Sequence, residues 1–202
     1  MKKTLIMVGL LALVASTAFA AKGDTWFGVQ GGIASPTGDI GKEFKTGYDG
    51  SILGSYGVAK DCQLGLEAGY FAFKAKDDFN TALGSGADAK LTLIPITAFT
   101  TYAFPMKDSK SMPYVKLGLG IYMAKSKIDG ITPAVDTTIT KFCGNIGLGY
   151  NYEVSPMYTI GLNVAYHMIM AGDSFKKEDG TKINPSFFTA GINLNFGMKA
   201  KK

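Results

Sequence analysis

A strict alternation of large apolar residues with small or polar ones is the feature that most constrains this chain. Between Tyr158 and Met170, every even-numbered position carries Tyr, Ile, Leu, Val or Met. The odd-numbered positions carry Thr, Gly, Asn, Ala and His, with Ile169 as the one large apolar exception. Successive side chains of a β-strand point to opposite faces, so this period predicts a strand with one apolar face. An amphipathic helix needs a spacing of three and four residues, which fits this segment less well.

The same alternation recurs along the chain and predicts eight strands. The pattern is blurred in the third strand by Phe71 and Phe73, and Pro95 leaves the faces of the fourth unassigned. Each strand is close to the ~9–11 residues that a tilted strand needs to cross a bilayer. The predicted strands are 26–34, 48–58, 63–74, 91–104, 115–123, 142–152, 158–170 and 188–196.

The connections between these strands alternate in length. Those near 59–62, 105–112 and 153–157 are short, and the others are longer, polar and rich in Gly, Asp, Lys and Thr. An even number of strands also lets the first pair with the last, which leaves no sheet edge in lipid. The pattern predicts an all-β fold, an eight-stranded antiparallel up-and-down transmembrane β-barrel with its termini in the periplasm. The four longer connections are 36–47, 75–90, 126–139 and 171–184.

The first twenty residues have the pattern of an export signal. Lys2 and Lys3 precede an apolar run, and Ala18-Phe19-Ala20 fits the small-x-small rule for cleavage between Ala20 and Ala21. We therefore expect residues 1–20 to be a signal peptide and residues 21–202 to be an outer-membrane β-barrel domain. This signal argues against a cytoplasmic enzyme, and Ala rather than Cys at position 21 disfavours a lipoprotein anchor.

Composition separates a membrane barrel from other exported folds. Only 18% of residues are charged, and the chain has 26 Gly, 13 Phe and 10 Tyr, whereas about 25% charge is usual in soluble domains. No apolar run after the signal approaches the ~18 residues of a spanning helix. All basic residues are Lys, and the longest basic cluster is the C-terminal tail, so nucleic-acid binding is not expected.

A soluble carrier with an apolar cavity is the main alternative that period two leaves open. Such a barrel needs a polar exterior, whereas a membrane barrel needs large apolar side chains outside. Here the opposite face carries Gly, Asn, Thr, Ser and a few charges, which would line a poor cavity for a lipid-like ligand. The membrane barrel is favoured. Aromatic residues near the strand ends also suggest two interfacial belts, a periplasmic one that includes Trp26 and Tyr114 and a second one that includes Phe71.

Three segments carry a resemblance to a known family, namely Gly31–Asp39, Pro113–Gly120 and Gly144–Tyr166. Their order resembles the small outer-membrane β-barrels of the OmpA-type, OmpX-like and OmpW-like group, over residues 24–198. The resemblance implies an envelope-stabilising, adhesive or narrow-channel role. Such barrels usually end at an aromatic residue that is read by the outer-membrane assembly machinery. Here Gly197 to Lys202 follow Phe196, so the role of this tail is open.

The inward face is the candidate functional site. Glu67 on the third strand and Lys116 on the fifth are both expected to point into an interior just wide enough for side chains. Because an unpaired charge there would be unfavourable, we expect an ion pair or a polar network that includes both. The other expected members of this lumen network are Asn145, Asn163 and Asn193.

Catalysis, cofactors and metal binding are not expected. His167, the only histidine, falls on the inward face, and although Asp173 and Ser174 follow it, no motif marks a lipid A-modifying enzyme. Cys62 and Cys143 are placed at opposite ends of a barrel whose core is about 25 Å tall. A disulfide needs Cα atoms within ~7 Å, so two free thiols are expected.

The function expected from the sequence is a structural or surface-interaction role of an integral outer-membrane protein. A narrow channel for small solutes or hydrophobic molecules is the alternative, and a lipid A-modifying enzyme is a remote one. Expected partners are outer-membrane lipid, lipopolysaccharide and the assembly machinery. The long loops, in which Lys and Asp are mixed, are the place where a surface partner would bind.

Overall fold

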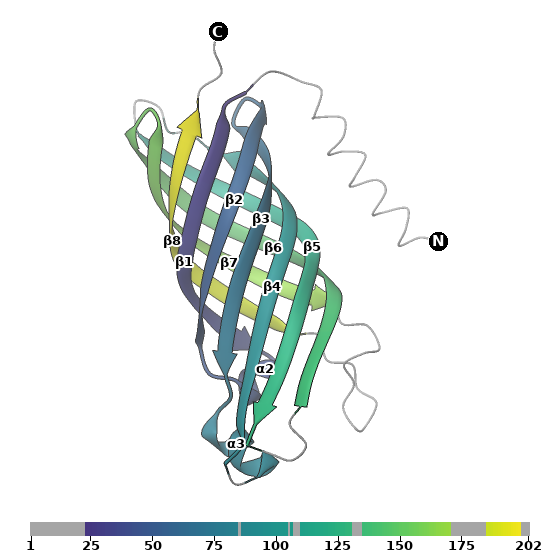
Figure 1. Cartoon of the computed structure of the whole chain (residues 1–202). Helices are drawn as coiled ribbons and strands as arrows, with labels where there is room; N and C mark the ends of the chain where they lie inside the picture. Colours follow the sequence, from purple (N-terminus) through teal and green to yellow (C-terminus); the bar gives the residue numbers. More distant parts are fainter. Residues whose placement is uncertain are drawn as a thin grey trace.

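Eight antiparallel strands close into a single barrel in the computed structural model (Figure 1), which describes residues 23–84, 86–104, 106, 110–130, 135–170 and 185–198. Each strand pairs with its neighbours in sequence, and β1 pairs with β8. The predicted up-and-down barrel is therefore confirmed. The strands are β1 (Thr25–Thr37), β2 (Gly47–Ala59), β3 (Cys62–Lys74), β4 (Asp88–Ala103), β5 (Ser111–Asp129), β6 (Val135–Ser155), β7 (Tyr158–Met170) and β8 (Ser186–Met198).

The short turns lie at one end of the barrel, together with the beginning of β1 and the end of β8 (Figure 1). We call this the periplasmic end. Outer-membrane barrels have short periplasmic turns and longer extracellular loops, which sets this orientation. The β2–β3 turn is tight because Asp61 adopts φ 62°, a left-handed conformation that Asp tolerates better than most residues. The last strand continues beyond Phe196, since Met198 pairs with Thr25.

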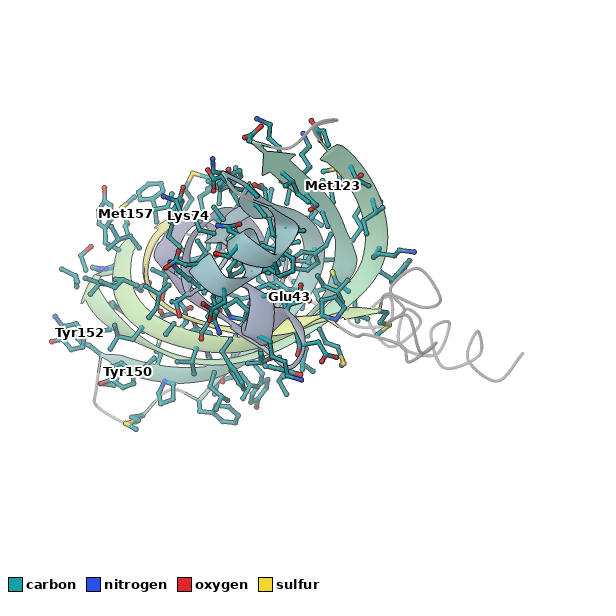
Figure 2. The ribbon with its side chains drawn as sticks, turned by 90° about the horizontal axis from the view of Figure 1, so that it is seen from below. Glu43, Lys74, Met123, Tyr150, Tyr152 and Met157 are labelled. Carbon is teal, nitrogen blue, oxygen red and sulfur yellow. The ribbon has the colours of Figure 1, made fainter. Side chains whose placement is uncertain are left out.

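The two faces of the strands have the predicted polarity. Outward residues such as Ile52, Leu66 and Leu162 expose 64%, 67% and 62% of their surface, and Tyr150 and Tyr152 project away from the barrel in Figure 2. An apolar surface this continuous far exceeds the few hundred Å² that soluble monomers expose. Its natural environment is hydrocarbon, as the membrane barrel requires.

Three aromatic residues of the expected belts point inward instead. Phe71 is 3% exposed and packs inside the barrel, while Trp26 and Tyr114 line a pocket at the periplasmic end. The belt prediction was wrong for these three, because it used their position along the strand and ignored the parity that fixes their face. The same parity resolves the fourth strand, where Pro95 and Thr97 point inward and Ile96 outward.

The extracellular half of the interior is filled by an apolar cluster. Phe187 is fully buried, and its ring lies 5.1 Å from that of Phe71, 5.7 Å from Phe73 and 6.0 Å from Tyr122, centroid to centroid. Phe71 and Phe73 blur the sequence pattern because β3 is apolar on both faces here. We call the cluster the aromatic plug; its buried members are Ala34, Ile40, Phe44, Phe71, Phe73, Ala75, Ala89, Leu93, Tyr122, Ala124, Cys143, Ile169 and Phe187.

Two short helices cover the plug, and neither was predicted. These are α2 (Ile40–Glu43) and α3 (Asp77–Leu83), and the view in Figure 2 shows them lying across the end of the barrel. Ile40 and Phe44 are buried in the plug, and Phe79 of α3 packs against it, 6.0 Å from the Phe44 ring. None of the helices in the described residues has the length and apolar character needed to span a bilayer.

The connection predicted at 126–139 is mostly strand. β5 continues to Asp129 and β6 begins at Val135, so the two form one hairpin with 19-residue and 21-residue strands. The alternation is weak there because Lys, Ser, Asp and Thr occupy both faces, as suits a hairpin outside lipid. The residues 1–20 and the tail from 199 onward, on which the signal-peptide and tail predictions rest, lie outside the described residues.

The position of the plug predicts that alanine substitution of two adjacent phenylalanines of β8 will lower the stability of the barrel by very different amounts. Phe187 is 0% exposed and Phe188 is 52% exposed on the lipid-facing side. Phe187→Ala should lower the free energy of unfolding by about 3–5 kcal/mol, because it leaves a cavity in a packed cluster. Phe188→Ala, the matched control, should lower it by less than half as much. Urea unfolding of both refolded barrels in lipid vesicles measures this, and equal losses would contradict the assigned faces.

Candidate functional site

The polar interior centres on an ion pair between Glu67 of β3 and Lys116 of β5. The Lys116 Nζ atom lies 2.5 Å from Glu67 Oε2, and the two side chains are 14% and 10% exposed. Ser51 of β2 donates a hydrogen bond of 2.8 Å to the other carboxylate oxygen, Oε1. The ammonium also lies 4.6 Å from the centroid of the Phe99 ring, a cation–π distance. Each charge is thus held by several partners.

The register of the sheet explains how two non-adjacent strands meet. Glu67 pairs with Thr97 of β4, and Lys116 pairs with Thr101, four residues farther toward the periplasmic end. The long lysine side chain therefore runs back along the lumen to reach the carboxylate. Thr97, which points inward between them, is small enough to let the pair form across β4.

Asparagines of β6, β7 and β8 form a second hydrogen-bonded group. Asn193 Nδ2 donates to Asn151 Oδ1 over 2.8 Å, and Asn163 Nδ2 donates to Asn193 Oδ1 over 3.4 Å. Asn163 and Asn193 thus meet, joined by Asn151, which the predicted site did not include although the alternation places it inward. Asn145 is buried on the same wall, beside the backbone of Gly118. Within the described residues, no hydrogen bond links Asn145 to either group.

His167 lies on the ion-pair side of the plug and contacts the plug residues Phe71, Tyr122 and Phe187. The His167 Nδ1 atom is 2.6 Å from the Tyr122 hydroxyl oxygen, and its Nε2 atom is 3.2 Å from Thr189 Oγ1. The imidazole stacks on Phe187 with a centroid distance of 4.7 Å and an interplanar angle of 3°. It is 8% exposed, so it is presented neither to lipid nor to bulk water. This position offers a lipid A substrate no access to the imidazole, and Asp173 and Ser174 lie outside the described residues.

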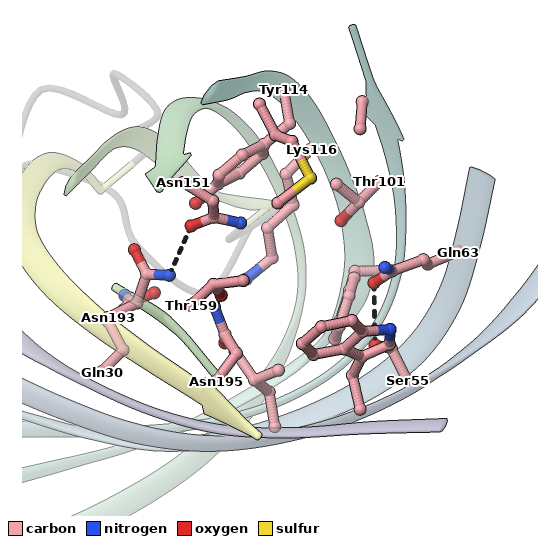
Figure 3. A pocket seen from close by; sticks show the side chains of 15 residues that line it. Gln30, Ser55, Gln63, Thr101, Tyr114, Lys116, Asn151, Thr159, Asn193 and Asn195 are labelled. Carbon is pink, nitrogen blue, oxygen red and sulfur yellow. Dashed lines mark hydrogen bonds between the residues drawn. The ribbon is translucent and has the colours of Figure 1, made fainter. Parts of the chain in front are cut away.

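A pocket of about 100 Å³ lies between the ion pair and the periplasmic end (Figure 3). Lys116 lies in its floor. Amide and hydroxyl side chains from seven strands, three aromatic rings and a few aliphatic side chains form its wall. The interior is therefore graded along the axis: the pocket comes first, then the ion pair, then His167, and finally the plug. The alternation predicts which residues face inward but not this sequence of layers.

The two cysteines are free, as predicted. Cys143 is fully buried in the plug. Cys62 begins β3 at the periplasmic end, where its sulfur lies 3.8 Å from Thr100 Oγ1. The barrel thus holds the two thiols at its opposite ends.

The closed barrel, its apolar exterior and its filled polar interior define an outer-membrane β-barrel protein. The chain belongs to the outer membrane protein beta-barrel domain family, whose model matches residues 6–196. The protein is therefore located in the outer membrane, surrounded by its lipid. No curated protein sequence matches the chain significantly.

Two solved structures show the same fold. Neisserial surface protein A is 18% identical, with a TM-score of 0.57, and the match covers 84% of this chain and 95% of that one. Ail, the attachment invasion locus protein of Yersinia pestis, crystallised with the heparin analogue sucrose octasulfate, is 14% identical with a TM-score of 0.55. That match covers 87% of this chain and 100% of Ail. At these identities the similarity establishes architecture alone.

Removing one partner of the buried ion pair should destabilise the barrel. Glu67→Gln leaves the Lys116 ammonium without its counter-charge in a low-dielectric interior, and we expect a loss of about 3–5 kcal/mol. The double variant Glu67→Gln/Lys116→Met should recover most of this loss, because it removes the uncompensated charge. Urea unfolding in vesicles measures all three barrels.

The control is an exposed pair on the β5–β6 hairpin. Lys127 Nζ lies 2.9 Å from Asp129 Oδ1, and both side chains are about half exposed. Asp129→Asn should change stability by less than about 1 kcal/mol. A Glu67→Gln barrel as stable as the unmodified protein would show that the lumen is solvated well enough to hold a single charge.

Proposed function

We propose that the protein is a surface-interaction protein whose β5–β6 hairpin binds a partner by adding a strand to its open edge. The observation that carries this proposal is the pairing of β6. Residues 142–155 pair with β7, whereas residues 135–141 pair only with β5 among the described residues. That segment is about 24 Å long at ~3.4 Å per residue.

An unpaired strand edge outside lipid presents backbone donors and acceptors in a fixed row. Natural proteins usually protect such an edge with charge, proline or a covering segment. Here the side chains of residues 136–141 are Asp136, three threonines, Ile139 and Lys141, so a charge stands at either end of a neutral stretch. Asp136, Thr137, Thr138 and Thr140 are exposed. Threonine favours extended backbone, and a partner strand can gain main-chain hydrogen bonds at such an edge. The edge therefore suits an extended peptide segment of another protein.

The aromatic plug argues against the alternative, a narrow channel. A solute entering from the periplasmic end would have to pass the ion pair, His167 and the five buried aromatic rings of the plug, and then the covering helices. Packed interiors of this kind contain few voids larger than a water molecule. The barrel then acts as a rigid support that fixes the hairpin above the membrane. Ail, which shares the fold, is by its name an attachment and invasion protein. Contact of surface lysines with lipopolysaccharide, and insertion by the assembly machinery, complete the set of partners we propose.

Proline substitutions at two neighbouring positions test whether the edge of residues 135–141 binds a partner strand. Consecutive residues of an antiparallel strand direct their N–H groups to opposite sides, so one of Thr137 and Thr138 faces β5 and the other faces the open edge. Thr137→Pro and Thr138→Pro should therefore differ. The proline on the open side should abolish most adhesion without changing barrel stability, whereas the other should disturb the hairpin. Adhesion of a non-adherent bacterial strain that displays each barrel, measured on cultured animal cells and on matrix-coated surfaces, tests this.

The controls keep the backbone donors. Thr137→Ala and Thr138→Ala retain both N–H groups and should adhere as the unmodified barrel does. Amide hydrogen exchange gives a second measurement, with alternate fast and slow amides expected along residues 135–141. Uniformly slow exchange would mean that another part of the chain covers the edge, and adhesion no higher than that of cells without the barrel would contradict the interaction role.

Planar-bilayer recording separates the proposed role from the channel. The refolded barrel, its closure checked by a heat-dependent gel shift, should show no discrete openings because the plug fills the lumen. Phe71→Ala/Phe187→Ala, which removes two rings from the plug, should increase the frequency of openings if the barrel remains folded. Reproducible openings of the unmodified protein would favour the channel.

A further inference from the structure

The pocket at the periplasmic end has the chemistry of a small-molecule site that neither the fold nor the hairpin explains. It lies at the opposite end of the barrel from the β5–β6 hairpin, with the plug and His167 between them. Its volume of about 100 Å³, at the ~30 Å³ that one water takes up in the liquid, corresponds to roughly three waters. A site of that size has room for at most one small ring.

The wall of the pocket combines polar groups with apolar and aromatic side chains and is almost without charge. Lys116 is the only charged side chain among the residues that line it, and its ammonium is paired with Glu67 in the floor. Burying a charged ligand in such a site would require a counter-charge that the wall does not offer. The pocket therefore favours a neutral ligand. Its polar groups are mainly amides, contributed by Gln30, Gln63, Asn151, Asn193 and Asn195.

These amides are held in place and still have hydrogen-bonding capacity. Asn193 donates to Asn151 over 2.8 Å, and Asn195 Nδ2 donates to Thr159 Oγ1 over 3.0 Å. Ser55 Oγ donates to Gln63 Oε1 over 3.0 Å, so this amide is fixed as well (Figure 3). A primary amide has two N–H donors and an acceptor oxygen with two lone pairs, more than these bonds use. Hydroxyl groups, which both donate and accept, match such a wall.

Three aromatic rings, those of Trp26, Phe99 and Tyr114, border the pocket, and glycines set the position of two of them. Trp26 and Tyr114 line the pocket, and each ring lies against the backbone of a glycine on a neighbouring strand. A Cβ added at Gly197 would lie 2.7 Å from Trp26 ring carbons, and one added at Gly149 would clash with the Tyr114 ring. Both rings are therefore seated against the wall and border the pocket, where they can contact the apolar C–H face of a ring-shaped ligand.

We infer that this pocket binds a single neutral pyranose ring from the periplasmic side, with the aromatic faces on its C–H surface and the amides on its hydroxyl groups. The ligand can be a free monosaccharide or the terminal ring of a glycan chain, because the pocket has room for at most one ring. The ion pair beneath the pocket closes its floor and keeps Lys116 neutralised.

The single tryptophan of the chain makes the inference directly measurable. Trp26 is the only Trp in the sequence, so fluorescence of the refolded barrel reports on the pocket alone. Titration with glucose and N-acetylglucosamine, in a zwitterionic detergent whose head group contains no sugar, should give a saturable change. Gluconate, which is charged, should give none. A short glycan oligomer that competes with the monosaccharide, or fails to, distinguishes a chain end from a free sugar as the ligand.

Two substitutions on the same face of β6 provide the matched comparison. Asn151 lines the pocket and Asn145 does not, although both are inward asparagines. Asn151→Leu should weaken binding about tenfold, the effect of losing one or two hydrogen bonds, while Asn145→Leu should bind within about twofold of the unmodified barrel. Both must first show the gel shift of a folded barrel. If Asn151→Leu does not fold, Gln63→Leu replaces it with the same expected loss.

Three outcomes would overturn the inference. The first is the absence of any saturable change with either sugar, which would mean that the pocket holds only water. The second is equal binding by the Asn151→Leu and Asn145→Leu barrels, which would place the site elsewhere. The third is equal binding of xylitol, an open-chain polyol, which would show that the rings of Trp26 and Tyr114 recognise no sugar face. None of these outcomes depends on the function proposed for the hairpin.

Discussion

Closure of the hydrogen-bonded ladder between β1 and β8 is the constraint on which the rest of the structure depends. In lipid, every unpaired backbone N–H or C=O group costs several kcal/mol, because no water is present to replace the lost partner. The thirteen residues Thr25–Thr37 each pair with a residue of Ser186–Met198, so the first and last strands leave no open seam between them. Once the barrel is closed, the alternation of side chains determines which residues contact hydrocarbon and which fill the narrow interior.

The interior changes from polar to apolar along the barrel axis, and this change follows from how far water can enter. At the periplasmic end the lumen is open, so amides and hydroxyls suffice and the wall leaves a pocket. Farther in, Glu67 and Lys116 can both remain charged only because each compensates the other. Beyond them His167 bonds to Tyr122 and Thr189, and then aromatic rings exclude water altogether. The helices α2 and α3 belong to the same arrangement, because Ile40, Phe44 and Phe79 extend the plug past the end of the strands.

The sequence alone predicts the barrel, the number of strands and the face of most residues, because period two is a local signal. The ion pair could also be anticipated, since two inward charges of opposite sign need each other. What period two does not contain is the relative level of residues on different strands. The hydrogen bond from Asn193 to Asn151 and the contact of the Tyr114 ring with Gly149 depend on register.

The short helices and the long β5–β6 hairpin were missed for another reason, because polar segments outside lipid lose the alternation that marks the membrane strands. Trp26 shows that parity is a better guide than position along a strand.

The plug separates the two ends of the barrel, so that binding at the β5–β6 hairpin and binding in the periplasmic pocket are independent of each other. A change at the open edge of residues 135–141 must be transmitted through the buried aromatic rings of the plug, His167 and the ion pair before it affects the periplasmic pocket. Coupling between distant sites requires an element with two discrete states that both sites bias. The ion pair is the one element in contact with the pocket that could be broken, yet it is held by Ser51 and Phe99 as well as by its own charges. The barrel is therefore best understood as a rigid wall between two environments, in which each end interacts with its own surroundings and the centre provides stability.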